Sequence, residues 1–116
     1  MSARIRDRLS GIAPWSGLIG AGMGFALHHQ VLSDALHFDC NDTAGGASIV
    51  MGLVALIVVF GGGLVSWRAL PAADATSPAA TLRRFIGHMS VMAALLATLG
   101  IALLMLAGAI LPGCRP

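Results

Sequence analysis

The chain has 116 residues, of which 57% are hydrophobic and only 10% are charged. Soluble domains carry roughly 25% charged residues, so this composition excludes an ordinary water-soluble protein and favours one that lies in a lipid bilayer. The formal net charge is +2, and the arginines that supply the positive charge form no run longer than a pair. Because binding to phosphates requires many clustered cations, nothing here indicates a nucleic-acid partner.

Three long stretches of the chain carry no Asp, Glu, Lys or Arg. They cover residues 9–33, 43–67 and 85–114 and are 25, 25 and 30 residues long. A helix needs about 20 apolar residues to cross the bilayer core, and no alternation typical of barrel strands is visible. The sequence therefore predicts an all-α membrane protein with one domain, residues 1–116. Its three transmembrane helices are expected at about residues 12–36, 46–68 and 80–111.

The first stretch follows a basic segment, as the apolar part of a secretory signal does. It contains Pro14, Trp15 and several glycines, and it lacks a clear small-x-small cleavage site. We therefore expect it to be retained as a membrane span. Residues 1–10 are expected to form a short cytoplasmic arm, with Ser10 as the helix N-cap and Pro14 in the first turn.

The arginines predict the orientation of the chain in the membrane. Three precede the first helix and three lie between the second and the third: Arg4, Arg6, Arg8, Arg68, Arg83 and Arg84. The positive-inside rule then places the N-terminus and the second loop in the cytoplasm, and the first loop and the C-terminus outside. The expected location is the bacterial cytoplasmic (inner) membrane, crossed several times.

Both cysteines fall on the predicted outer side. Cys40 lies in the first loop, and Cys114 follows the third helix. In an oxidising compartment such a pair is expected to form a structural disulfide, worth on the order of 4 kcal/mol. The alternatives are a pair of soft metal ligands or a redox dithiol, which usually place the two cysteines close together in the sequence.

Small residues form stripes along the first and third predicted helices. The positions are Gly17, Gly20, Ala21, Gly24, Ser90, Ala94, Thr98 and Ala102. In lipid, small residues allow helix backbones to approach closely, and such stripes are the usual surface for helix association. The stripes can either pack the three helices on one another or contact a neighbouring protein, and both interpretations stay open.

The histidines are the candidate cofactor or proton sites. His28, His29 and His37 lie toward the outer side, whereas His88 begins the third helix. His28 and His88 are about 15 Å apart in depth at 1.5 Å per residue, which is unsuitable for the two axial ligands of one haem.

The spacing of the outer histidines matches no recognised metal motif, so we predict no metal and no cofactor, and His28, His29 and His37 are the alternative candidates for a metal site. For His88, no second buried acid or base continues a proton path. The sequence also lacks a catalytic triad order or a phosphate loop, so no enzymatic activity is predicted.

A set of short motifs indicates a known group of proteins. These are Cys40, Ser66-Trp67-Arg68 at the end of the second helix, Arg83-Arg84-Phe85 at the start of the third, and Leu111-Pro112 followed by Cys114. Their order resembles the small triple-spanning proteobacterial membrane proteins encoded beside haem-copper cytochrome c oxidase genes. That resemblance implies an accessory or assembly protein of the oxidase, without catalytic residues.

The expected function is thus that of a non-catalytic accessory subunit or assembly factor of a larger energy-transducing membrane complex. A respiratory cytochrome c oxidase is the expected complex, and its other transmembrane subunits are the expected partners. The alternative is a metal- or haem-handling membrane protein that uses the outer histidines.

Overall fold

The computed structural model describes residues 3–38, 44–71 and 75–110, and every regular element in these ranges is helical. The elements are α1 (Ala3–Ile12), a 3₁₀ turn η1 (Ala13–Trp15), α2 (Ser16–Phe38), α3 (Ala44–Arg68) and α4 (Pro78–Ile110). The all-α class predicted from the sequence is thus observed in the described part of the chain.

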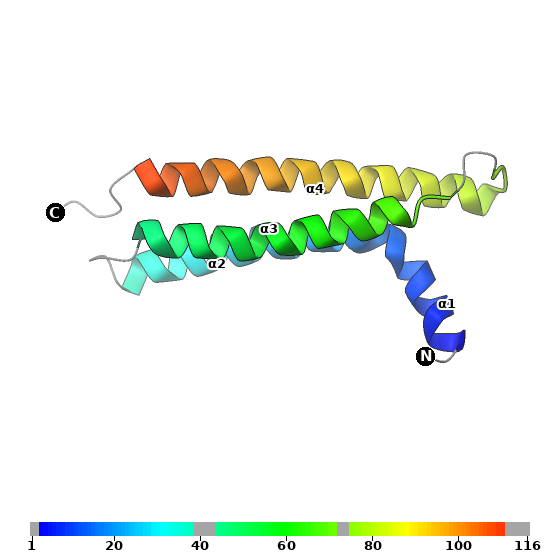
Figure 1. The fold of residues 1–116 in the computed structure, drawn as a ribbon, viewed down its shortest axis with the longest axis horizontal. Coiled ribbons are helices and arrows are strands. Elements are labelled where there is room, and N and C mark those ends of the chain that lie inside the picture. The colour runs from blue at the N-terminus through cyan, green and yellow to red at the C-terminus, as the bar shows by residue number, and fades with distance from the viewer. Residues whose placement is uncertain (1–2, 39–43, 72–74, 111–116) are drawn as a thin grey trace.

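The three long helices lie side by side and run in alternating directions, and α1 leaves the bundle at an angle (Figure 1). The molecule measures 61 × 28 × 15 Å along its principal axes. At one end of it lie α1, the last turn of α3 and the first turns of α4 (Figure 1). We call this the arginine end, because Arg68 closes α3 there and Arg83 and Arg84 lie near the start of α4.

Within the described residues, two helical segments are long and apolar enough to cross a membrane. They are Ser48–Arg68 and Pro78–Ile110. Helix α2 does not meet the same criterion, and the polar run His28, His29 and Gln30 gives the physical reason. Helix α4 has 33 residues. It is therefore about 50 Å long at 1.5 Å per residue, which exceeds the bilayer core of about 30 Å.

Apart from Val59 and Ile101, the apolar interior of the bundle is built from alanines, and many large apolar side chains face outward. The buried apolar residues are Ala21, Ala55, Val59, Ala94, Ala97 and Ile101. Large residues such as Ile57, Phe60 and Leu96 are exposed on α3 and α4. Small residues at helix contacts and large apolar residues on the surface are the arrangement expected where lipid is the solvent.

Glycines set the close approach of α2 to its two neighbours. A Cβ atom added at Gly20 would lie 3.0 Å from the carbonyl oxygen of Val58, and one at Gly24 would lie 2.9 Å from that of Ala55. A Cβ atom at Gly17 would come within 2.7 Å of the backbone oxygen of Ser90 on α4. Any larger side chain at these positions would push the helices apart.

The prediction that Ser10 is the N-cap of the first helix was wrong. The chain is helical from Ala3, and the Ser10 hydroxyl donates back to the carbonyl of Asp7 at 2.7 Å instead of capping a helix. Arginine and leucine favour helix, so residues 3–12 continue the helical path. The helix is interrupted only at Pro14, which lacks an N–H and lies in the 3₁₀ turn.

Candidate functional site

Among the described residues, buried polar groups occur in two places in the bundle. The first is near the arginine end and consists of Pro14, Ser16, Ser66 and Ser90, which we call the serine cluster. The second is toward the opposite end and consists of His28 and Ser48, which we call the histidine pair. The side chains of Ser66, Ser90, His28 and Ser48 are all fully buried.

The serine cluster joins all three long helices around the break at Pro14. Ser66 Oγ on α3 accepts the Gly17 N–H at 2.8 Å and donates to the Pro14 carbonyl at 3.0 Å. Ser90 Oγ on α4 donates to the same carbonyl at 2.7 Å. Ser16 Oγ donates to the carbonyl of Gly62 at 3.0 Å. Each of these hydroxyls therefore has a partner on another helix or on the turn.

The serine cluster has a structural explanation. The 3₁₀ turn at Pro14 interrupts the regular helical pattern, and backbone groups at such a break must find other partners when no water is present. Serine hydroxyls from α3 and α4 supply these partners, so the cluster holds the bent N-terminal region on the bundle. It leaves no polar atom free for chemistry on a ligand.

The histidine pair differs, because its polar atoms lack partners. The two ring nitrogens of His28 make no hydrogen bond within the described part of the chain, and neither does the hydroxyl of Ser48. His28 is 0% exposed. Burying a polar group without a hydrogen bond costs roughly 1–3 kcal/mol by protein mutational data. Such a group in a membrane bundle is a candidate for binding water, a ligand or a partner group.

The register of the helices places the two members of the pair near each other in depth. Gly24 of α2 lies against Ala55 and Val59 of α3, and α2 and α3 run in opposite directions. One helical turn further along α2, His28 is therefore level with the turn of α3 that contains Gly52. Ser48 lies one turn beyond Gly52, against Gly108 of α4.

The other histidines are separated from His28. His29 is exposed, and its ring lies 6.1 Å from the ring of Phe25 between centroids. The exposed His88 has Nδ1 at 2.7 Å from the carbonyl of Arg84, one turn back on its own helix. The side chain of His37 is outside the described residues. In the described ranges, no three His, Cys, Asp or Glu side chains gather as a metal site.

The small-residue stripes lie largely at contacts inside the chain. Gly17, Gly20, Ala21, Gly24, Ser90 and Ala94 are buried, Thr98 is half-buried and Ala102 is exposed. Most of these positions therefore pack the three helices on one another. Their contact with a partner stays a prediction, for which Ala102 is the most accessible position. The predicted disulfide also stays a prediction, because Cys40 and Cys114 both lie outside the described residues.

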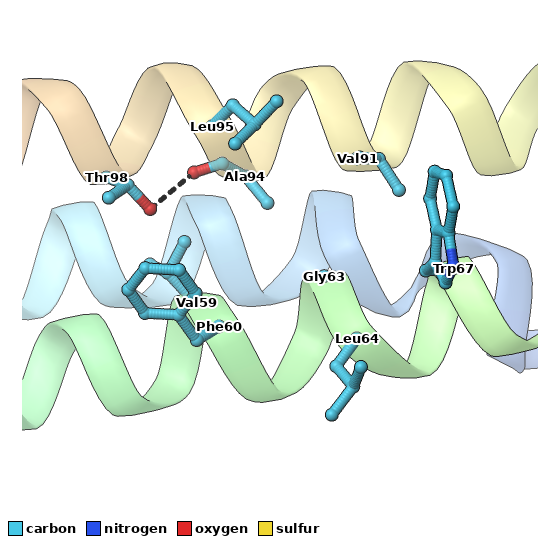
Figure 2. Close-up of a pocket in the computed structure, with 9 residues that line it drawn as sticks. All are labelled: Val59, Phe60, Gly63, Leu64, Trp67, Val91, Ala94, Leu95 and Thr98. Carbon is cyan, nitrogen blue, oxygen red and sulfur yellow. Dashed lines mark hydrogen bonds between the residues drawn. The ribbon is translucent and has the colours of Figure 1, made fainter.

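An open apolar groove runs between α3 and α4 (Figure 2). Its volume is about 210 Å³, and it is lined by Val59, Phe60, Gly63, Leu64, Trp67, Val91, Ala94, Leu95 and Thr98. The Thr98 hydroxyl does not add a polar site, because it donates to the Ala94 carbonyl at 2.8 Å. Sequence reasoning missed this groove, although the small residues Gly63 and Ala94 on neighbouring helices were a signal for it.

Comparison with known proteins found no matching family model, no similar curated protein and no similar solved structure. The groove and the histidine pair are therefore interpreted from their own geometry.

Proposed function

We propose that α2 crosses the membrane beside α3 and α4, which makes three spans, and that the arginine end faces the cytoplasm of a bacterial cell. Two features support this placement. Helix α2 packs along both other long helices, so it shares their environment. The arginines of α1, α3 and α4 all lie at one end, as the positive-inside rule requires for a cytoplasmic side.

In this membrane the protein acts as a non-catalytic accessory subunit or assembly factor of an energy-transducing complex, a respiratory cytochrome c oxidase in particular. It carries no cofactor of its own, and it binds other transmembrane subunits. The resemblance of its short motifs to proteins encoded beside oxidase genes supports the choice of complex. The groove between α3 and α4 is the single structural observation that carries the partner role.

The groove suits a partner helix for two reasons. Gly63 and Ala94 form the floor of the groove, and the exposed side chains of Phe60, Leu64 and Leu95 lie around it, where a partner helix can contact them (Figure 2). In lipid, such close packing provides much of the free energy of helix association. Because the described lining residues offer no unpaired hydroxyl, the partner surface expected here is also apolar.

Purification of the tagged full chain in mild detergent tests this proposal. Respiratory-complex polypeptides are expected to co-purify with the natural chain and to be lost with Gly63→Leu, which fills the groove and also brings a Cβ atom to 3.1 Å from the Cβ atom of Ala94 on α4. Gly61→Leu controls for the added leucine alone, since a Cβ atom at Gly61 meets nothing within 4 Å. Helix content and elution volume in detergent show that both variants are folded.

Two results would count against the partner role. One is recovery of the natural chain alone under conditions that preserve the oxidase. The other is equal co-purification of the complex with the folded Gly63→Leu and Gly61→Leu variants, because the groove would then not be the contact.

A second candidate function is the handling of a metal or haem, and the unpaired His28 ring favours it. An imidazole without a hydrogen-bond partner is a ready ligand for such a group. An absorption spectrum and metal analysis of the purified chain separate the two functions. A Soret band or stoichiometric copper that disappears with His28→Leu and persists with His29→Leu would establish this candidate in place of the first.

A further inference from the structure

Helix α1 has an apolar stripe that no other part of the described chain covers. Ile5, Leu9 and Ile12 repeat at intervals of four and three residues and are each about half-exposed. At about 100° per residue, these three side chains lie within about 60° of one another around the helix. The stripe is therefore one continuous face.

The arginines of α1 flank that stripe on both sides, with Arg4 and Arg8 on one side and Arg6 on the other. Arg8 lies about 40° from Ile12 on one side, and Arg6 about 60° from Leu9 on the other. Asp7 lies about 160° from Leu9, on the opposite face. An apolar stripe flanked by cations, with the acid facing away, is the pattern of a helix that lies in the headgroup layer of a membrane.

The apolar stripe also borders a hollow against the bundle. A space of about 520 Å³ is lined by Arg6, Leu9, Ser10, Ile12, Ala13, Ser16 and Val65. Val65 belongs to the exposed surface of α3, which is one of the segments apolar enough to cross a membrane. The hollow thus lies between α1 and the exposed apolar surface of α3, and Arg6 is one of its lining residues.

From this arrangement we infer that α1 lies on the headgroup layer and that the hollow beneath it takes an acyl chain of an anionic phospholipid, whose phosphate pairs with Arg6. Charge complementarity identifies the lipid, because Asp7 is the one acid among the described residues of α1, beside three arginines. The inference rests on the proposed membrane placement of the bundle.

A protein partner fits α1 less well than lipid does. The stripe consists of three side chains, whereas a stable protein interface takes roughly 20–30 residues on each side. A short apolar stripe with flanking cations is instead sufficient for a helix already tethered to a membrane span, since the tether keeps it at the surface.

Fluorescent labelling of the full chain in vesicles tests the inference. A single cysteine is introduced as Leu9→Cys or as Asp7→Cys in a chain that also carries Cys40→Ser and Cys114→Ser, and it is labelled with an environment-sensitive dye. The vesicles contain phosphatidylcholine alone or with phosphatidylglycerol. We expect the dye at position 9 to report an apolar environment, and this signal to grow when the vesicles contain phosphatidylglycerol. The dye at position 7 should report water in both kinds of vesicle.

The arginines provide a second, quantitative measurement. Neutralising one of them, as in Arg6→Gln, is expected to lower the equilibrium constant for docking of α1 on phosphatidylglycerol vesicles about fivefold at low salt. The effect should shrink as salt is added, because exposed charges are screened. In native mass spectrometry the same variant is expected to retain less phosphatidylglycerol than the natural chain.

The outcomes distinguish this inference from the membrane placement on which it rests. A dye at Leu95→Cys, on the exposed face of α4, reports whether the bundle lies in lipid. Apolar surroundings at position 95 with water at both positions 7 and 9 would overturn the inference for α1 alone. Water at position 95 would overturn both. Protection at position 9 that depends on protein concentration and not on phosphatidylglycerol would assign the face to a second copy of the chain.

Discussion

The two buried polar regions of the bundle both contain serine hydroxyls, yet they differ in whether their polar side chains make hydrogen bonds. In the serine cluster, the hydroxyls of Ser16, Ser66 and Ser90 all bond across helices. In the histidine pair, the ring of His28 and the hydroxyl of Ser48 have no partner within the described residues. Ser66 and Ser90 are as fully buried as His28 and Ser48, so burial alone does not explain the difference.

The local backbone explains why the serine cluster is hydrogen-bonded and the histidine pair is not. Beside the serine cluster, the 3₁₀ turn at Pro14 presents carbonyl oxygens that need donors, and the serines supply them. Around the histidine pair, α2 and α3 are regular helices whose backbone groups already bond within each helix. Neither His28 nor Ser48 bonds to these backbone groups or to another described side chain. The hydrogen bonds of the serine cluster are therefore explained by the break at Pro14, whereas no such break lies beside His28 or Ser48.

The largest expected difference between the two regions is in their tolerance of a methyl group. A Cβ atom at Gly62 would lie 2.5 Å from the carbonyl oxygen of Ser16, which is backbone and cannot move aside. Gly62→Ala is therefore expected to lower the free energy of unfolding by about 3 kcal/mol, at the upper end for overpacking. At Gly52 the atoms nearest to the added Cβ atom belong to the flexible side chain of Met105 and not to backbone. Gly52→Ala should cost less than about 1 kcal/mol, since alanine also favours helix.

Unfolding of the full chain in mixed micelles measures both free energies. Gly61→Ala is the matched control, because its added Cβ atom meets open space and only the helix preference changes. Equal losses for Gly62→Ala and Gly52→Ala would show that the two regions are packed alike, contrary to the comparison.

The next largest effect is expected from removing a buried hydroxyl that has hydrogen-bond partners, compared with removing one that has none. Ser66→Ala leaves the Gly17 N–H and the Pro14 carbonyl with fewer partners in a buried place. It should lower the free energy of unfolding by about 1–3 kcal/mol. Ser48→Ala removes a hydroxyl that makes no hydrogen bond among the described residues, so its effect should be near zero or slightly stabilising. The same unfolding measurement applies, and a destabilising Ser48→Ala would reveal a partner for that hydroxyl.

His28 gives a smaller change of opposite sign. Because its buried ring is unpaired, His28→Leu should raise the free energy of unfolding by about 1 kcal/mol in the purified chain. His29→Leu is the control, since that side chain is exposed on the same helix. A destabilised His28→Leu variant would mean that the natural ring is bonded, to water or to a bound group. Metal analysis and an absorption spectrum of the same preparation decide between these.

The comparison also shows what the sequence could and could not predict. The helical class could be predicted from the long uncharged stretches, because an apolar stretch of about 20 residues or more is typical of a helix surrounded by lipid. Expected helices at about residues 46–68 and 80–111 lie close to α3 and α4. Helix α1 was missed because the expected cap at Ser10 suggested a helix start, whereas capping depends on a backbone break that occurs at Pro14.

The sites were predicted less well than the helices. The sequence predicts that His28 and His29 lie toward the outer side and point about 100° apart on a helix. Which of the two faces the bundle depends on the rotation of α2 against its neighbours, and the glycines at positions 20 and 24 set that rotation. The groove depends on the same packing of two helices, so no single stretch of sequence reveals it.

The smallest expected effect concerns Thr98, whose hydroxyl bonds within its own helix. It donates to the Ala94 carbonyl, which lies four residues back and is already an acceptor of the helical backbone. Thr98→Val keeps the shape of the side chain and removes only this extra bond, so the free energy of unfolding should change by less than about 0.5 kcal/mol. A loss comparable to that of Ser66→Ala would mean that hydroxyls stabilise this bundle wherever they lie. The distinction between bonds across helices and bonds within a helix would then no longer explain the serine cluster.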